Sequence, residues 1–171
     1  MTWTAPEVTR PTGSLTGDER ETLTGFLAFY RSTLLRKCVG LTGRQLAEQT
    51  VAPSNLSLLG LVRHMAKVER IWFREGLQGL SMPPMYNPEK GKDADFEDYS
   101  PDRASDDYAR LIEEIRLADE AVAGASLDDT FTHRGSLYSL RTVHVHMIAE
   151  YARHVGHADL LRERLDGTTG A

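Results

Sequence analysis

The chain has 171 residues and a formal net charge of −5. That length predicts a single domain, residues 1–171, that can bury a hydrophobic core without disulfides or structural metal ions. The acidic balance does not fit a nucleic-acid-binding protein, which normally carries a basic surplus or stripe. Cys38 is the only cysteine, and this excludes an intramolecular disulfide, a zinc ribbon and a CxxC redox site.

Nothing in the sequence suggests secretion or membrane insertion. The N-terminal residues lack the apolar stretch of a signal peptide. No segment approaches the roughly 20 apolar residues of a membrane span. We therefore expect a cytoplasmic protein without a membrane partner, with flexible ends at residues 1–14 and 166–171.

Four long segments have the periodicity of amphipathic helices, and no segment reads as a strand. The first helix is predicted to begin at Thr16 and to end near Gly40. The second is predicted to begin at Ser54–Ser57, with an apolar face along one side. Its opposite side carries four basic residues, which we interpret as a solvent-exposed face: Arg63, Lys67, Arg70 and Arg74.

A long loop over residues 79–100 is predicted between the second and third helices, and loops of this length are often functional or partly mobile. The third helix is predicted to begin at Ser100–Pro101 and to end near Gly124. After an irregular stretch, 125–137, the last helix covers 139–165. Four such helices predict an all-α fold, a four-helix bundle. Up-and-down order is preferred, although the long loop permits a crossover.

The last helix carries the most informative pattern. A histidine interrupts its apolar seam, whose residues are Met147, Tyr151, His154, Ala158, Leu161 and Leu165. Glu150 lies one turn before His154 and about 40° around the helix, so both side chains lean inward. A buried carboxylate is costly unless it is paired or binds a metal, and one divalent cation satisfies both groups. His64, which flanks the apolar stripe of the second helix, is available as a third ligand.

Spacing alone leaves other interpretations open. Glu150 and His154 also fit a simple Glu–His⁺ pair on one helix. His146, with these two residues, is an alternative ligand set across two turns, and His157 is a candidate partner that supports His154. No G-x-S-x-G, P-loop or G-x-G-x-x-G motif is present. Candidates for substrate contacts are Tyr30, Tyr86 and Tyr151.

Two blocks of the sequence resemble a known family. One comprises Ser57–Ala66 and Val68–Phe73, and the other is His146–Asp159. Together they resemble the DinB-like superfamily, which includes the mycothiol-dependent maleylpyruvate isomerase, and they fit best an actinobacterial branch. The resemblance covers nearly the whole chain in helix order. It implies a four-helix bundle, often dimeric, with one metal bound by three residues.

The resemblance implies that the metal ligands are His64, Glu150 and His154. DinB proteins proper use two histidines in the last helix, whereas the mycothiol-dependent enzymes use Glu and His, as this sequence does. One divalent metal is expected, with zinc first and nickel, iron or manganese as other options. The partners implied are mycothiol as a thiol cosubstrate, a small-molecule electrophile and a second copy of the chain in a homodimer.

This site leads us to predict a metal-dependent, mycothiol-type S-transferase or isomerase in which the metal activates a thiolate. A metal-dependent hydrolase is an alternative, and it predicts activity without any added thiol. A non-catalytic, dimeric, metal-binding stress-response protein is a third reading, and it predicts metal binding without turnover.

Overall fold

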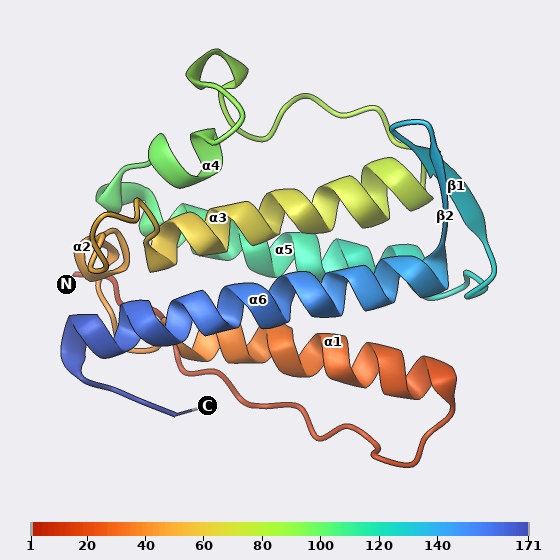
Figure 1. Ribbon diagram of the computed structural model, residues 1–171, viewed down its shortest axis with the longest axis horizontal. Coiled ribbons are helices and arrows are strands. Elements are labelled where there is room, and N and C mark those ends of the chain that lie inside the picture. The colour runs from red at the N-terminus through yellow and green to blue at the C-terminus, as the bar shows by residue number, and fades with distance from the viewer. Residues whose placement is uncertain (1, 171) are drawn as a thin grey trace.

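The computed structural model describes residues 2–170 of the chain. The protein is mostly helical and contains one small two-stranded sheet. Four long helices lie side by side along the long axis of the molecule (Figure 1). They are α1 (Glu19–Arg36), α3 (Leu58–Glu69), α5 (Ala104–Val122) and α6 (Leu140–Asp166). No helix within the described residues has the length and hydrophobicity that crossing a bilayer requires.

Shorter elements join and extend the long helices. A π-helix, η1 (Arg70–Leu77), continues α3 without a break. The predicted long loop over residues 79–100 is interrupted by two short turns of helix. The remaining elements are α2 (Gly43–Leu46), η2 (Pro88–Lys90), α4 (Ala94–Glu97), η3 (Pro101–Arg103), β1 (Thr130–His133) and β2 (Ser136–Ser139).

The start of α1 differs from the prediction by a few residues because a better cap follows Thr16. The Asp18 carboxylate accepts a hydrogen bond from the Glu21 backbone N–H at 2.9 Å, and the Glu21 carboxylate accepts one from the Asp18 N–H at 3.1 Å. This reciprocal pair is a capping box, and its negative charges favour a helix N-terminus. The helix ends at Arg36, and turns rather than helix lead on to Gly40.

The preferred up-and-down order is wrong. Helices α1 and α6 run in one direction, and α3 and α5 run in the other (Figure 1). Two ion pairs join α3 with its continuation η1 to α5, Arg63 to Asp107 and Arg70 to Glu114, and each spans 44 residues. Equal offsets at both points mean that the neighbouring segments are parallel. The physical reason is the long connection, which crosses back over the length of α3 before α5 begins.

The basic side of the second helix is not a solvated face, because parallel α5 places acidic groups along it. The Arg63 side chain is buried and bonds both carboxylate oxygens of Asp107 at 2.9 and 3.0 Å. Arg70 and Arg74 both bond the buried carboxylate of Glu114. Asp107 and Glu114 lie seven residues apart, which is two helical turns, so both point at the same neighbour.

The absence of strands was also a wrong prediction. Strand β1 pairs with β2 in antiparallel register, with Thr130 opposite Ser139 and His133 opposite Ser136. The two turn residues, Arg134 and Gly135, have φ values of 49° and 79°. Positive φ at both positions is the geometry of tight turns that match the twist of a hairpin.

The N-terminal segment, which was predicted to be flexible, makes defined contacts with the helices. Ala5 is 3 % exposed and pairs through its backbone with Leu41 at 2.9 Å and Gly40 at 3.0 Å. At the other end, the Lys37 ammonium donates to the carbonyl of Gly170. Both ends of the described chain therefore rest on the region where α1 finishes.

Candidate metal centre

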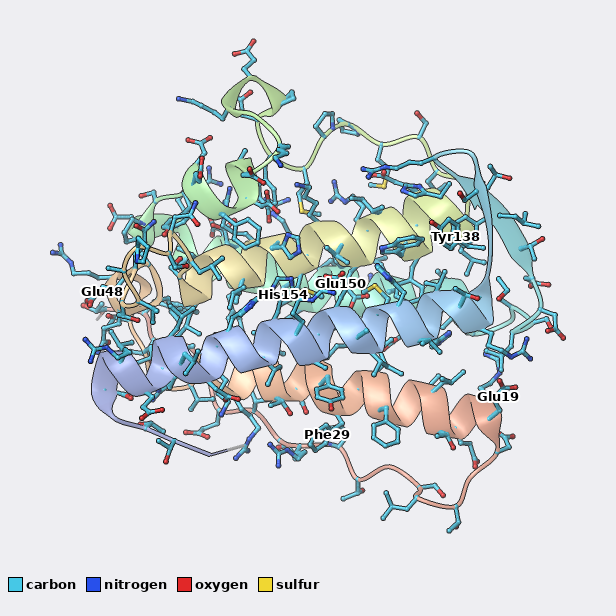
Figure 2. The ribbon with its side chains drawn as sticks, viewed as in Figure 1. Glu19, Phe29, Glu48, Tyr138, Glu150 and His154 are labelled. Atoms are coloured by element: carbon cyan, nitrogen blue, oxygen red, sulfur yellow. The ribbon has the colours of Figure 1, made fainter. Side chains whose placement is uncertain are left out.

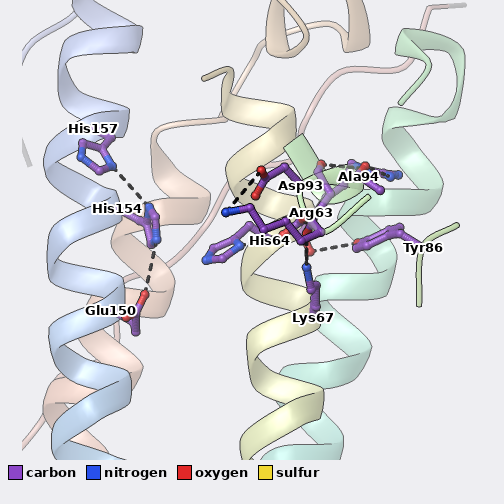
Figure 3. A network of polar contacts seen from close by, with 11 residues as sticks. Arg63, His64, Lys67, Tyr86, Asp93, Ala94, Glu150, His154 and His157 are labelled. Atoms are coloured by element: carbon purple, nitrogen blue, oxygen red, sulfur yellow. Dashed lines mark hydrogen bonds and ion pairs between the residues drawn. The ribbon is translucent and has the colours of Figure 1, made fainter. Parts of the chain in front are cut away.

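Three side chains converge between α3 and α6. His64 comes from α3, and Glu150 and His154 come from the face of α6 that is turned toward α3 (Figures 2 and 3). One potential ligand atom from each residue lies within 4.8 Å of the other two. The Nε2 of His154 is 3.4 Å from a Glu150 oxygen, and the ring centroids of the two histidines are 4.7 Å apart.

His154 is prepared for metal binding by its surroundings. Burial, reinforced by the electrostatic influence of the neighbouring His64, lowers the pKa of His154 from 6.5 to about 4. The ring is therefore neutral at physiological pH, which is the form that binds a metal. Its Nδ1 lies 3.3 Å from Nδ1 of His157, so Nε2 is the nitrogen that faces Glu150 (Figure 3).

The three residues fit a divalent ion in both chemistry and spacing. Two imidazoles and one carboxylate suit zinc, nickel, iron or manganese. Ligand atoms around tetrahedral zinc are about 3.4 Å apart, given bonds of about 2.0–2.1 Å. The three candidate ligand atoms lie within 4.8 Å of one another, so an ion at this site would draw them closer together. Three protein ligands would leave a coordination position open.

The alternative ligand set through His146 is not brought together. Its Nε2 is 3.9 Å from a Glu150 oxygen, and His146 does not belong to the converging group. The ring instead lies against Trp72 of η1, with centroids 4.6 Å apart. The same indole contacts His133 and Tyr138 of the hairpin. His146 is thus part of an aromatic cluster one turn away from the candidate centre.

A carboxylate that the sequence analysis did not single out reaches the back of His64. The Asp95 side chain, from α4, lies 2.8 Å from Nδ1 of His64 and 3.1 Å from Nζ of Lys67. Burial acts to raise the pKa of Asp95, but hydrogen bonds from His64 and Lys67 outweigh it and hold this pKa below its usual value. The ring of Phe96 stacks on His64 at 4.6 Å. The only sequence signal was the apolar character of Phe96 within the loop.

Comparison with known proteins identifies the family of this chain. Residues 22–167 match the family model described as mycothiol-S-transferase. The chain belongs to the mycothiol-S-transferase family. The resemblance to mycothiol-dependent transferases of DinB-like type is thereby confirmed. No curated protein and no solved structure matches the chain.

For a member of the mycothiol-S-transferase family, the source of the thiol matters. Cys38 is fully buried, and this burial raises the pKa of its thiol to about 12. A thiol in that state is neither accessible nor ionised at neutral pH, so it is a poor nucleophile. Cys38 is therefore not available as a nucleophile in this structure.

Two of the three tyrosines considered for substrate contacts are engaged elsewhere in this mycothiol-S-transferase family member. Tyr151 is buried in the core, where its hydroxyl donates to Glu69 at 2.8 Å. The Tyr86 hydroxyl donates to the backbone carbonyl of Arg63 at 2.9 Å. Tyr30 lies edge to face with the ring of Phe29. None of these contacts directs a hydroxyl at the candidate metal centre.

Proposed function

We propose that this protein is a metal-dependent mycothiol S-transferase. The ion, zinc in the first instance, is held by His64, Glu150 and His154, between α3 and α6 of a bundle formed by the four long helices. The observation that supports this proposal is the convergence of two imidazoles and a carboxylate within 4.8 Å in a chain of this family. The DinB-like resemblance also favours a homodimer.

A divalent ion at an open three-ligand site lowers the pKa of a thiol that binds there, and so supplies a thiolate at neutral pH. The residues of the chain prepare that position. Burial keeps His154 neutral with Nε2 turned inward, and His157 occupies the space behind it. Glu150 contributes the one negative charge among the three groups, which keeps the site attractive to a cation.

The proposed reaction joins two substrates. The sulfur of mycothiol attacks an electrophilic carbon of a small molecule, an S–C bond forms, and the thiol proton passes to solvent. The leaving group of the electrophile departs with the electron pair of the bond that breaks. Because Cys38 is buried with a raised pKa, the sulfur comes from the cosubstrate and not from the chain.

The test combines metal analysis with transfer assays on the purified protein. We expect one stoichiometric metal ion and metal-dependent transfer of mycothiol to a bimane halide, followed by fluorescence. His64→Ala and Glu150→Ala should lose the metal and slow transfer by about 100-fold or more, since even residues that merely support ligands are worth 10–100-fold. His133→Ala is the matched control, because this histidine lies outside the converging group.

Three outcomes would contradict the proposal. Turnover of an ester or amide that needs the metal but no thiol would indicate a hydrolase. Stoichiometric metal without any turnover, whichever electrophile is offered, would indicate a metal-binding protein. Absence of metal from the wild type, prepared without chelators, would remove the site itself.

A further inference from the structure

The long connection between η1 and α5 returns to the candidate centre at α4. Asp95 of α4 is 1 % exposed, although it carries a charge. One of its oxygens lies 2.8 Å from Nδ1 of His64, and the other lies 3.1 Å from the Lys67 ammonium. Both oxygens are thus engaged by side chains of α3, one by His64 and the other by Lys67.

The position of Asp95 is fixed by Arg63. Its guanidinium donates to three backbone carbonyls of this segment, those of Ala94 at 3.2 Å, Asp95 at 3.0 Å and Asp98 at 2.9 Å. These groups satisfy the C=O ends that a helix of four residues leaves open. The same guanidinium is paired with the carboxylate of Asp107. The segment is therefore clamped to both α3 and α5 and does not depend on its own short helix for order.

The packing of α4 against α3 is close. A Cβ added at Gly60 would lie 3.3 Å from the ring of Phe96, so a larger residue at Gly60 would push on that ring. The Phe96 ring in turn stacks on the imidazole of His64, with 25° between the planes. His64 is held by a hydrogen bond at Nδ1 and by an aromatic face across its plane, so its ring has little freedom to turn.

This inference rests on the metal site of the proposed function: we propose that Asp95 is a positioning residue for His64. Its carboxylate accepts a hydrogen bond from the Nδ1–H group of His64. This bond leaves the lone pair on Nε2, where it can face the two candidate ligands on α6. A carboxylate that carries the Lys67 ion pair has only acceptor oxygens, so the proton between Asp95 and His64 resides on the imidazole. Such a partner fixes the tautomer of a ligating histidine and increases its basicity.

Two other roles for Asp95 fit the contacts less well. It is not a fourth ligand, because both of its oxygens are occupied and it lies outside the converging group of described residues. A purely structural ion pair with Lys67 would explain its burial. That role, however, predicts no effect on the state of His64 or on metal affinity, and this difference makes the two roles separable.

The test uses the full chain and zinc alone as the probe. Asp95→Ala removes the acceptor, Asp95→Asn keeps an oxygen of the same reach, and Asp93→Ala removes a neighbouring carboxylate whose side chain is 52 % exposed. Zinc affinity is measured by competition with a fluorescent chelator, and folding by circular dichroism. We expect Asp95→Ala to weaken zinc binding by about 10- to 100-fold. Asp95→Asn should recover part of that loss, and Asp93→Ala should match the wild type.

A second measurement covers the case in which Asp95→Ala does not fold. The ring nitrogens of His64 in the metal-free wild type, read by long-range ¹H–¹⁵N correlation, should show the proton on Nδ1 and a lone pair on Nε2. A proton on Nε2 overturns the proposal. So does wild-type zinc affinity in folded Asp95→Ala, or an equal loss in Asp93→Ala.

These readouts separate the two proposals. A wild type that binds zinc, loses affinity in Asp95→Ala and yet transfers no thiol contradicts the proposed function and supports the role of Asp95. A wild type that transfers thiol, together with an Asp95→Ala variant whose zinc affinity is unchanged, supports the proposed function and contradicts the role of Asp95. A wild type that binds no zinc overturns both.

Discussion

His154 makes the metal-free protein sensitive to acid. Its pKa in the folded chain is about 4, against 6.5 for an unperturbed histidine, mainly because the ring is buried. Between these two values the unfolded chain takes up a proton at this residue and the folded chain does not. The free energy of unfolding therefore falls as the pH drops from about 6.5 to about 4. From His154 alone we expect a loss of roughly 1–2 kcal/mol between pH 7 and pH 5.

Urea unfolding of the chelator-treated protein at the two pH values measures this loss. His144 is also buried, and its burial lowers its pKa. It therefore contributes to the total loss of stability both in the wild type and in the variant His154→Leu. His154→Leu places an apolar residue in the seam of α6. It should remove only the contribution of His154 to the pH dependence of the free energy of unfolding. An unchanged pH dependence in His154→Leu would show that protonation of this ring is not linked to folding.

The two candidate ligands on α6 could be predicted because their placement depends on local geometry alone. Positions four apart on a helix share a face, and the apolar seam shows which face is buried. His64 could be paired with them only through the family resemblance, since periodicity does not specify which helices are neighbours. Asp95 could not be found, because its contact with His64 spans 31 residues through a segment without periodicity.

At the scale of elements, the hairpin is fitted closely onto η1. The ring of Phe131 in β1 lies over Gly76, where an added Cβ would come within 2.5 Å of it. Gly76→Ala should therefore push the hairpin away from η1. We expect a destabilisation of about 1–3 kcal/mol, the usual cost of overpacking, measured as a shift in the urea midpoint.

Gly156→Ala is the matched control for this substitution. Gly156 also lies within a helix, α6, but an added Cβ there would meet nothing within 4 Å. Alanine should then stabilise the protein by about 0.5–1 kcal/mol, through helix propensity. Opposite signs for the two substitutions are the expected result. A neutral or stabilising Gly76→Ala would mean that the hairpin is loosely held.

The helices were easier to predict than the elements that join them. Ser139 caps α6 through the Thr142 backbone N–H, and Gly167 ends it with a φ of 77°, both as the sequence indicates. The hairpin was missed because its turn is Arg134–Gly135, which lacks the Asn or Asp typical of such turns. The parallel pairing of α3 with α5 was missed because loop length permits a crossover without requiring one.

At the scale of the whole molecule, one polar cluster, buried except for Asp119, joins the four long helices. Arg31 of α1 bonds both carboxylate oxygens of Glu69 in α3, at 2.7 and 2.6 Å, and it also bonds Asp119 of α5. Tyr151 of α6 donates to the same Glu69 at 2.8 Å. Burial and the charge of Glu69 raise the pKa of Tyr151, so its hydroxyl stays protonated and remains a donor.

This cluster should behave as a unit in mutagenesis. Arg31→Met leaves the fully buried carboxylate of Glu69 without its cation, and Glu69→Leu leaves the guanidinium without its main partner. Each single change should cost about 3–5 kcal/mol in the free energy of unfolding. The double variant should cost much less than the sum, because it removes both buried charges together.

A double-mutant cycle by urea unfolding measures this coupling. The control cycle uses the exposed pair Arg116 and Glu113 on α5, with Arg116→Met and Glu113→Leu. Solvent screens these charges, so a coupling of at most about 1 kcal/mol is expected. Because Arg31 and Glu69 belong to different long helices, strong coupling would show that α1 and α3 depend on one another through this pair. Additive losses in the Arg31–Glu69 cycle would mean that water or Asp119 compensates each charge separately. Apolar packing alone would then set the arrangement of the helices around the candidate metal centre.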